Sequence, residues 1–149
     1  TVKARDSMGR FVAKSKEATL AAIAAKAVKE CRYHLRRSQD WIIRLGDGTE
    51  ESHRRVQAGL DRVWGFSHEL FTMNDAERNL AAAGIAVDRA ALQAAWDKTV
   101  KTVVAQATLA LPDSDWSVQG GRDGVHTEHL GLLLAEMQFL QRAYPGLQW

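Results

Sequence analysis

The sequence predicts an all-α protein, and three observations lead to this fold class. Its composition is rich in residues that favour helices, namely Ala, Leu, Glu, Lys, Arg and Gln. Only two prolines occur, Pro112 and Pro145, so long helices can run without interruption. Apolar residues recur at spacings of three and four, whereas the alternation typical of strands is almost absent. Four substantial helices with flexible connectors indicate an all-α bundle.

The first helix is expected over residues 19–45. Its predicted packed face is one line of residues: Leu20, Ala24, Ala27, Cys31, His34, Ser38, Trp41 and Leu45. Other apolar residues lie outside this line, so we expect the helix to be covered on more than one side. It ends at "LGDGTEES", where Gly46 suits a left-handed cap and Thr49 suits the N-cap of the next helix.

The second helix is expected from about residue 50 to residue 71. The short connection before it predicts an antiparallel pair with the first helix. A short helix closed by Gly84 follows, and Asp88 suits the N-cap of a third long helix that reaches about residue 108. The predicted packed stripe of this third helix is Leu92, Trp96, Val100, Val103 and Ala107.

The last helix is expected over about residues 127–143. The segment before it, "LPDSDWSVQGGRDG", contains one proline and three glycines and therefore predicts an extended connector. The predicted packed face of the last helix is His126, Leu130, Leu133, Met137 and Leu140.

The bulk composition predicts one folded domain, residues 1–149. Of its 149 residues, 46% are hydrophobic and 26% charged, which excludes a disordered chain. The net charge is +2 with both signs interleaved, so nucleic-acid binding is not indicated. The longest apolar runs, such as residues 130–135, are too short to span a bilayer, and no leader opens the chain. A single cysteine agrees with a reducing compartment, and we expect a cytoplasmic protein.

The stretch "KECRYH", residues 29–34, raises the question of a metal site. A di-iron bundle takes Glu-x-x-His from each of two helices, whereas here Glu30 precedes His34 by four residues and Cys31 stands in the three-residue position. Glu30 and His34 can share a helix face and are weak metal-ligand candidates. The favoured interpretation makes His34 a buried, hydrogen-bonded core histidine.

Two further motifs offer chemistry, and both have a structural interpretation. "HTEH", residues 126–129, places two histidines near each other, but its position favours the start of a helix over a zinc site. Cys31 is expected on a packed face, where a thiol is ordinarily inert. We therefore predict no catalytic residue, no metal ligand set and no cofactor-binding motif.

Aromatic residues suggest contacts with a partner protein. The five tryptophans suit packing and interface anchoring better than a cofactor site. The predicted interface candidates are Tyr33, Trp41 and Trp149.

Three stretches carry a resemblance to a known family: "LAAIAAKAVKECRYHLRRSQDWIIRLGDGTEES", "AGIAVDRAALQAAW" and above all "GGRDGVHTEHLGLLLAEMQFLQRAYPGLQW". From about residue 19 to residue 149 the chain resembles the C-terminal part of the C subunits of bacterial ring 1,2-phenylacetyl-CoA epoxidases. The resemblance implies a ferritin-like helical fold. It also implies membership in a multicomponent oxygenase that epoxidises phenylacetyl-CoA in aerobic phenylacetate catabolism.

The same resemblance implies where the chemistry lies. In that family the di-iron centre belongs to a sister catalytic subunit, and the C subunit is its structural partner without a working iron site. Residues 1–18 fit the family poorly, and family members are longer. We therefore expect a C-terminal fragment, an incomplete bundle lacking its N-terminal helices, whose apolar first helix is exposed or covered in an oligomer.

Three functions remain open at the level of sequence. The favoured one is a non-catalytic structural subunit, not an enzyme on its own, that scaffolds the di-iron catalytic subunit. The alternative is a metal-binding ferritin-like oxygenase subunit that uses Glu30 and His34 with residues absent from this chain. A homo-oligomeric helical protein with a different function is the third.

Overall fold

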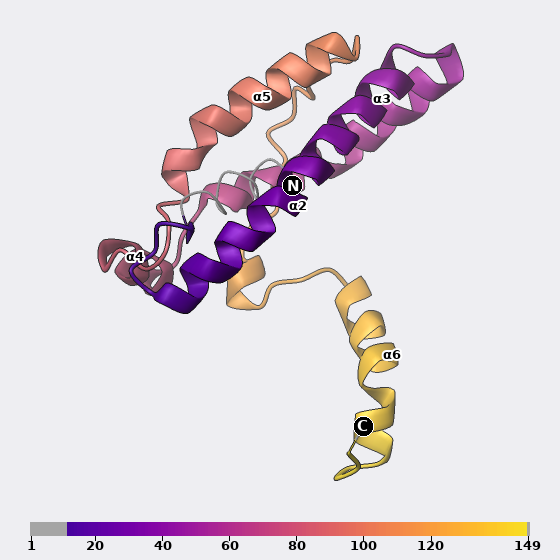
Figure 1. Ribbon diagram of the computed structural model, residues 1–149. Helices are drawn as coiled ribbons and strands as arrows, with labels where there is room; N and C mark the ends of the chain where they lie inside the picture. Colours follow the sequence, from indigo (N-terminus) through magenta and orange to yellow (C-terminus); the bar gives the residue numbers. More distant parts are fainter. Residues whose placement is uncertain (1–11, 149) are drawn as a thin grey trace. The chain divides into compact units, whose positions relative to one another are not determined.

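The structure, a computed structural model, describes residues 12–148 and contains helices but no strand in that range (Figure 1). The predicted all-α class is confirmed. The α-helices are α2 (Ala18–Gly46), α3 (Glu50–Trp64), α4 (Asp75–Ala82), α5 (Gln93–Gln106) and α6 (His129–Ala143). Short 3-10 helices are η1 (Gly65–Phe71), η2 (Ala90–Leu92) and η3 (Gly121–Asp123).

The chain forms two compact units, Thr1–Val118 and Gln119–Trp149. The core lies in the first unit, where α2, α3 and α5 pack against one another. One buried cluster consists of Phe71, Leu92 and Trp96, and a second consists of Val104, Ala107 and Leu109. Because four of the five residues of the stripe predicted for the third long helix are buried and Val100 packs against both clusters, that prediction is confirmed.

The first long helix, α2, begins and ends within one residue of its predicted bounds. Its N-cap is Glu17, whose carboxylate accepts hydrogen bonds from the backbone N–H groups of Leu20 at 2.6 Å and Thr19 at 3.1 Å. These bonds, chiefly the one from Leu20, hold the pKa of the Glu17 carboxyl below its usual value, because they favour the charged form.

Gly46 ends α2 in a way that the sequence did not predict. The left-handed cap predicted there is wrong, because Gly46 is the last helical residue and Asp47 is the C-cap. A Cβ atom on Gly46 would lie 2.3 Å from the carbonyl oxygen of Ala107. The glycine is therefore needed for the close approach of two backbone segments. Left-handed glycines occur instead at Gly84, Gly120, Gly124 and Gly146.

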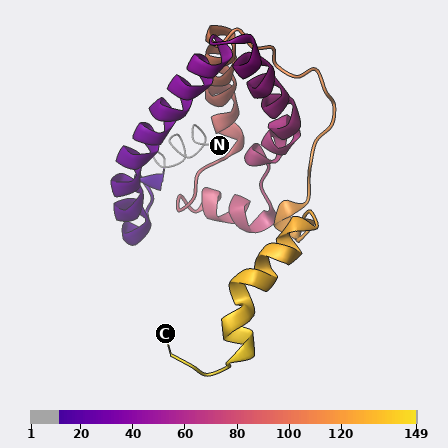
Figure 2. The same ribbon diagram turned by 90° about the vertical axis from the view of Figure 1, so that its right-hand side faces the viewer.

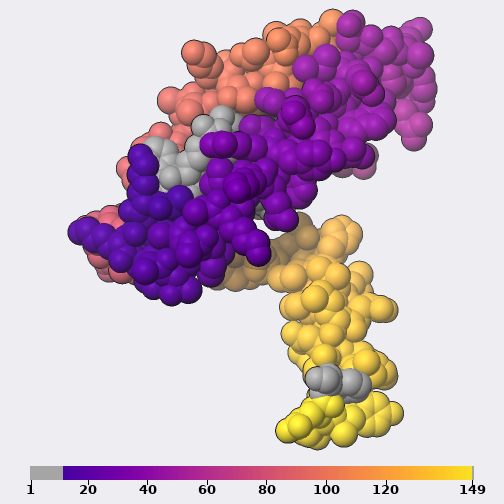
Figure 3. All heavy atoms as spheres, viewed as in Figure 1, coloured from indigo at the N-terminus to yellow at the C-terminus, as the bar shows by residue number. Residues whose placement is uncertain are grey.

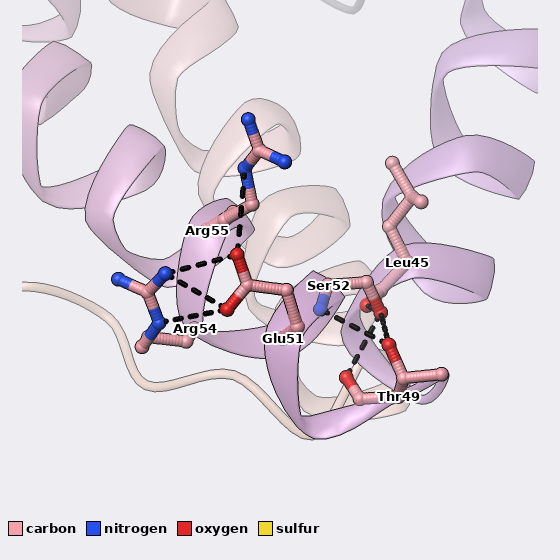
Figure 4. A network of polar contacts seen from close by, with 6 residues as sticks. All are labelled: Leu45, Thr49, Glu51, Ser52, Arg54 and Arg55. Atoms are coloured by element: carbon pink, nitrogen blue, oxygen red, sulfur yellow. Dashed lines mark hydrogen bonds and ion pairs between the residues drawn. The ribbon is translucent and has the colours of Figure 1, made fainter.

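The connection between α2 and α3 is short and well capped. Thr49 is the N-cap of α3, as predicted, and its hydroxyl accepts a hydrogen bond from the backbone N–H of Ser52 at 3.2 Å. The Ser52 hydroxyl donates to the carbonyl oxygen of Leu45 at 2.7 Å, which links the two helices (Figure 4). Figure 2 shows α2 and α3 meeting at this connection and diverging away from it.

The predicted second helix is correct up to Trp64, after which the chain tightens into η1. A Cβ atom on Gly65 would lie 2.0 Å from the ring of Trp116, so the connector packs directly on this glycine. The Ser67 hydroxyl also donates to the carbonyl oxygen of Trp64 at 2.7 Å, which competes with regular helical bonding. Both effects favour a change of helix type at this point.

The predicted short helix is α4, and it is closed by Gly84, as expected; this glycine has a left-handed conformation. Asn74 and Glu77 form a capping box at its start. The predicted N-cap at Asp88 is wrong, because Leu92 is the N-cap of α5 and Arg89 is that of the 3-10 turn η2; the Asp88 side chain accepts a hydrogen bond from the backbone N–H of Ala90 at 3.0 Å.

In the second unit, α6 begins at His129, two residues later than predicted. The expectation that its apolar line is packed is not met, because Leu133 is 55% exposed and Met137 is 66% exposed. Within the described part of this unit, α6 is accompanied only by the short η3 turn, which leaves most of its surface uncovered.

Among residues 12–148, no helix combines the length and the apolar character that crossing a bilayer requires.

Candidate functional site

The packed face of α2 differs from the predicted one, and this changes the position of His34. The buried residues of α2 are Ala24, Val28 and Gly46, and Leu35 rather than His34 faces α3 and α5. With about 100° of rotation per residue, His34 lies about a third of a turn from both Val28 and Leu35. His34 is exposed, so the prediction of a buried, hydrogen-bonded histidine is wrong.

The weak metal-ligand candidates do not converge on a site within the described residues. Glu30 and His34 are both exposed, Cys31 is half-buried, and the His34 ring lies beside that of Tyr33, with ring centroids 5.7 Å apart. Residues 12–148 contain no group of three or more His, Cys, Asp or Glu side chains placed to hold a metal ion. A di-iron centre needs donors converging from four helices, so the donors present here do not fit one.

One Glu-x-x-His spacing, formed by Glu50 and His53, was missed at the level of sequence. Glu50 is exposed in the first turn of α3, whereas His53 is half-buried. The Nδ1 atom of His53 lies 2.7 Å from the carbonyl oxygen of Gly46, to which the Thr108 hydroxyl also donates at 3.2 Å. His53 therefore links the end of α2 to α3, which is a structural role.

The histidines of "HTEH" lie at the start of α6, as predicted. His126 and His129 are exposed, and the Nε2 atom of His129 lies 3.8 Å from a carboxylate oxygen of Glu128. Glu128 is the N-cap residue, but its side chain makes no capping hydrogen bond. The motif thus begins a helix, and the Glu128 carboxylate makes no hydrogen bond to the backbone amides of the first turn.

An apolar groove lies between α2, α3 and α5, with a volume of about 540 Å³. Trp64 and Trp96 are among its lining residues, and their rings stack with centroids 5.8 Å apart and 29° between their planes. Other lining residues include Leu35, Ile42, Leu60, Val63 and Val100. The groove exists because the helices diverge from the α2–α3 connection (Figure 2), and it can accept apolar side chains.

The outer face of α2 carries a second surface feature, which we call the α2 patch. It consists of exposed residues that line one shallow depression of about 250 Å³: Tyr33, Arg36, Arg37, Asp40, Trp41 and Arg44. Two of the three predicted interface candidates, Tyr33 and Trp41, lie in it, 51% and 47% exposed. The third, Trp149, lies outside the described residues. Figure 3 shows how much of α2, drawn in indigo to purple, is uncovered on one face.

The arginines of the α2 patch were not predicted as site residues. Their signal was present in the sequence, because "RYHLRRSQDWIIR" repeats arginine beside tyrosine and tryptophan at helical spacing. The net charge of the whole chain does not reveal this cluster of arginines, because positive and negative residues are interleaved elsewhere in the sequence.

The sequence matches the phenylacetic acid catabolic protein family over residues 4–149. It is also similar to a curated protein from Escherichia coli (strain K12), the C subunit of 1,2-phenylacetyl-CoA epoxidase. The two are 48% identical over 135 residues, which cover 91% of this chain and 54% of that relative. The chain therefore spans about half the length of the relative. These matches confirm the resemblance inferred from the residues and the ferritin-like class of the helical fold.

Proposed function

The chain belongs to the phenylacetic acid catabolic protein family, and from that membership we propose that it is a non-catalytic structural subunit. The complex is the multicomponent oxygenase that epoxidises phenylacetyl-CoA in aerobic phenylacetate catabolism. The name of its relative, the C subunit of an epoxidase, supports this assignment. The partner is the di-iron catalytic subunit of the same complex, called the catalytic subunit below.

The observation that carries the structural role is the large apolar surface that two helices leave uncovered. On α6, Leu132, Met137 and Phe139 are each about two-thirds exposed, and on α2 Ile23 is 60% exposed. Apolar patches of this kind ordinarily mark surfaces that another protein covers. Burial of such side chains in a complex would supply association energy without any chemistry in this chain.

The proposed mechanism is mechanical. Rigid helices present apolar side chains that pack on the catalytic subunit, hold its helices in their active arrangement and exclude water from its substrate site. The outward position of Glu30 and His34 on α2 is compatible with this role, since neither side chain is directed toward the groove between the helices.

The test is co-expression of this protein with the tagged catalytic subunit, followed by affinity purification and metal analysis of each chain. We expect a stable mixed complex whose iron resides in the catalytic subunit. A double variant, Leu133→Ser with Met137→Ser, should weaken pairing by at least about 10-fold, because it removes exposed apolar contacts from α6. Gln141→Ser, a polar change on the same helix, is the control and should leave pairing unchanged.

Three results would contradict the proposal. Iron bound to this chain itself would favour the metal-binding subunit, and His34→Ala should then release that iron. Self-assembly into an oligomer of defined size that persists when the catalytic subunit is added, and that excludes this subunit, would favour the homo-oligomeric alternative. Unchanged pairing of the α6 double variant would show that the exposed apolar residues are not the contact surface.

A further inference from the structure

The α2 patch faces away from the packed side of its helix. Tyr33 and Arg44 lie roughly opposite Leu35 and Ile42, which line the apolar groove, when residues are placed at about 100° intervals around α2. All six patch residues are exposed and come from α2 alone. The patch is therefore a surface for contact and contributes nothing to the core of its own unit.

Positive charge is concentrated on this helix. The α2 sequence contains six Lys and Arg and two Asp and Glu, a net charge of +4, whereas the whole chain has a net charge of +2. The rest of the chain therefore carries a net charge of −2. Three of the six cations, Arg36, Arg37 and Arg44, lie in the α2 patch, with Asp40 as its only acid.

The patch arginines have no carboxylate partner among the described residues. No ion pair within 4.0 Å is found for Arg36, Arg37 or Arg44 in residues 12–148, although Asp40 is one helical turn from each. Elsewhere, Arg54 pairs with Glu51 of its own helix, as Figure 4 shows. The guanidinium groups of the patch are thus available to carboxylates from another molecule.

Two large aromatic side chains lie among these arginines. Tyrosine, tryptophan and arginine are the residue types that most often contribute the largest share of the binding free energy in protein–protein interfaces. Their rings provide apolar area at low cost in conformational entropy, while a guanidinium group binds a carboxylate with two parallel hydrogen bonds. A nucleic acid would instead favour a larger basic surface without Asp40 at its centre.

We infer that the α2 patch docks an acidic surface of the catalytic subunit. Carboxylates of that surface would pair with Arg36, Arg37 and Arg44, and its apolar side chains would cover the rings of Tyr33 and Trp41. The inference rests on the proposed function for the identity of the partner. It adds the position of the contact and the chemistry that forms it. It also predicts that the rate of association depends on salt concentration.

The test measures the dissociation constant between this protein and the purified catalytic subunit. The double variant Arg36→Glu with Arg37→Glu reverses two charges of the patch and should weaken binding by about 30-fold or more. The control is Arg62→Glu with Lys101→Glu, which makes the same change in net charge on exposed residues of α3 and α5. It should leave the dissociation constant within about 3-fold of wild type.

Three further measurements separate an effect on binding from an effect on folding. Circular dichroism should show the same helix content in both double variants. Trp41→Ala and Arg44→Gln, which add no new charge, should each weaken binding by about 5- to 10-fold. Raising NaCl from about 0.05 M to about 0.5 M should slow association of the wild type much more than that of the patch variant.

The outcomes separate the inference from the proposed function. Tight binding of the wild type and equal binding of all folded patch variants would overturn the inference and leave the proposed function standing. Absence of binding by the wild type would overturn both. Loss of duplex DNA binding in the patch variant, with pairing unchanged, would assign the patch to a nucleic acid and overturn the inference.

Discussion

Two helical glycines, Gly46 and Gly59, lie in opposite surroundings. A Cβ atom on Gly46 would meet the carbonyl oxygen of Ala107 at 2.3 Å and its Cβ atom at 2.8 Å. Nothing lies within 4 Å of the corresponding atom on Gly59, in the middle of α3. The same substitution should therefore change stability in opposite directions at the two positions.

Gly46→Ala should lower the free energy of unfolding by about 1–3 kcal/mol, because backbone atoms of a buried residue must move to admit the methyl group. Gly59→Ala should raise it by about 0.5–1 kcal/mol, because alanine loses less backbone entropy in a helix. Urea denaturation followed by circular dichroism measures both. Equal stability of Gly46→Ala and wild type would contradict the close approach of α2 to Ala107.

Residue type and spacing predicted the exposure of some side chains correctly and the burial of others wrongly. Tyr33 and Trp41 were expected to contact a partner and are exposed, but their role stays a prediction. His34 was placed on the packed face because it continues a regular spacing, yet the small residues Ala24 and Gly46 bring the neighbouring segments to another side of α2. Small residues leave little signal in a count of apolar positions, although they decide where helices approach.

At the scale of elements, the positions of the helices could be predicted from the sequence, but what packs against each helix could not always be predicted. The stripe of α5 could be predicted because its large apolar residues repeat over four turns and pack within their own unit. The change from α3 to η1 could not, because one of the two features that favour it is the packing of Trp116, which lies about fifty residues later in the sequence, on Gly65. The apolar line of α6 was correctly recognised as apolar, but periodicity alone does not say what covers such a line.

The first turn of α2 should respond to acid through Glu17. Its folded-state pKa is lowered by the hydrogen bonds from Leu20 and Thr19, so the carboxylate stabilises the helix end above the usual carboxyl pKa. That contribution is lost as the pH falls through the lowered folded-state value. We therefore expect the protection factor of the Leu20 amide in hydrogen exchange to fall progressively below its neutral-pH value as the pH is lowered.

Glu17→Gln provides the control for this titration. The single amide oxygen of glutamine can still accept the hydrogen bond from Leu20 but does not titrate, so protection at Leu20 should then be independent of pH once intrinsic exchange is corrected for. A Glu17 side chain that titrates at or above the usual carboxyl value, measured by NMR, would contradict the capping geometry.

At the scale of the whole molecule, a small net charge combines with a large exposed apolar area. The net charge at pH 7 is +2, and the isoelectric point calculated from the sequence is about 8.8. Exposed leucine, methionine and phenylalanine side chains on α6 and isoleucine on α2 favour self-association, while like charges on the copies oppose it.

We therefore expect the isolated protein to self-associate more strongly near its isoelectric point than at pH 7, where its net charge is +2. Sedimentation velocity at the two pH values measures the difference. About 0.5 M NaCl should reduce it, because salt screens the repulsion. A sedimentation coefficient independent of pH and salt would show that charge does not control association.

The packing of Trp116 on Gly65 has a consequence for limited proteolysis. The connector between α5 and η3 has no regular secondary structure and would ordinarily be cut first. Trypsin has no site between Lys101 and Arg122, and chymotrypsin must unfold the segment around Trp116, where the Val118 N–H donates to the carbonyl oxygen of Gly65 at 3.1 Å. Chymotryptic cleavage after Trp116 should be slow in the native protein and much faster in Gly65→Ala, so its rate reports whether the connector is docked.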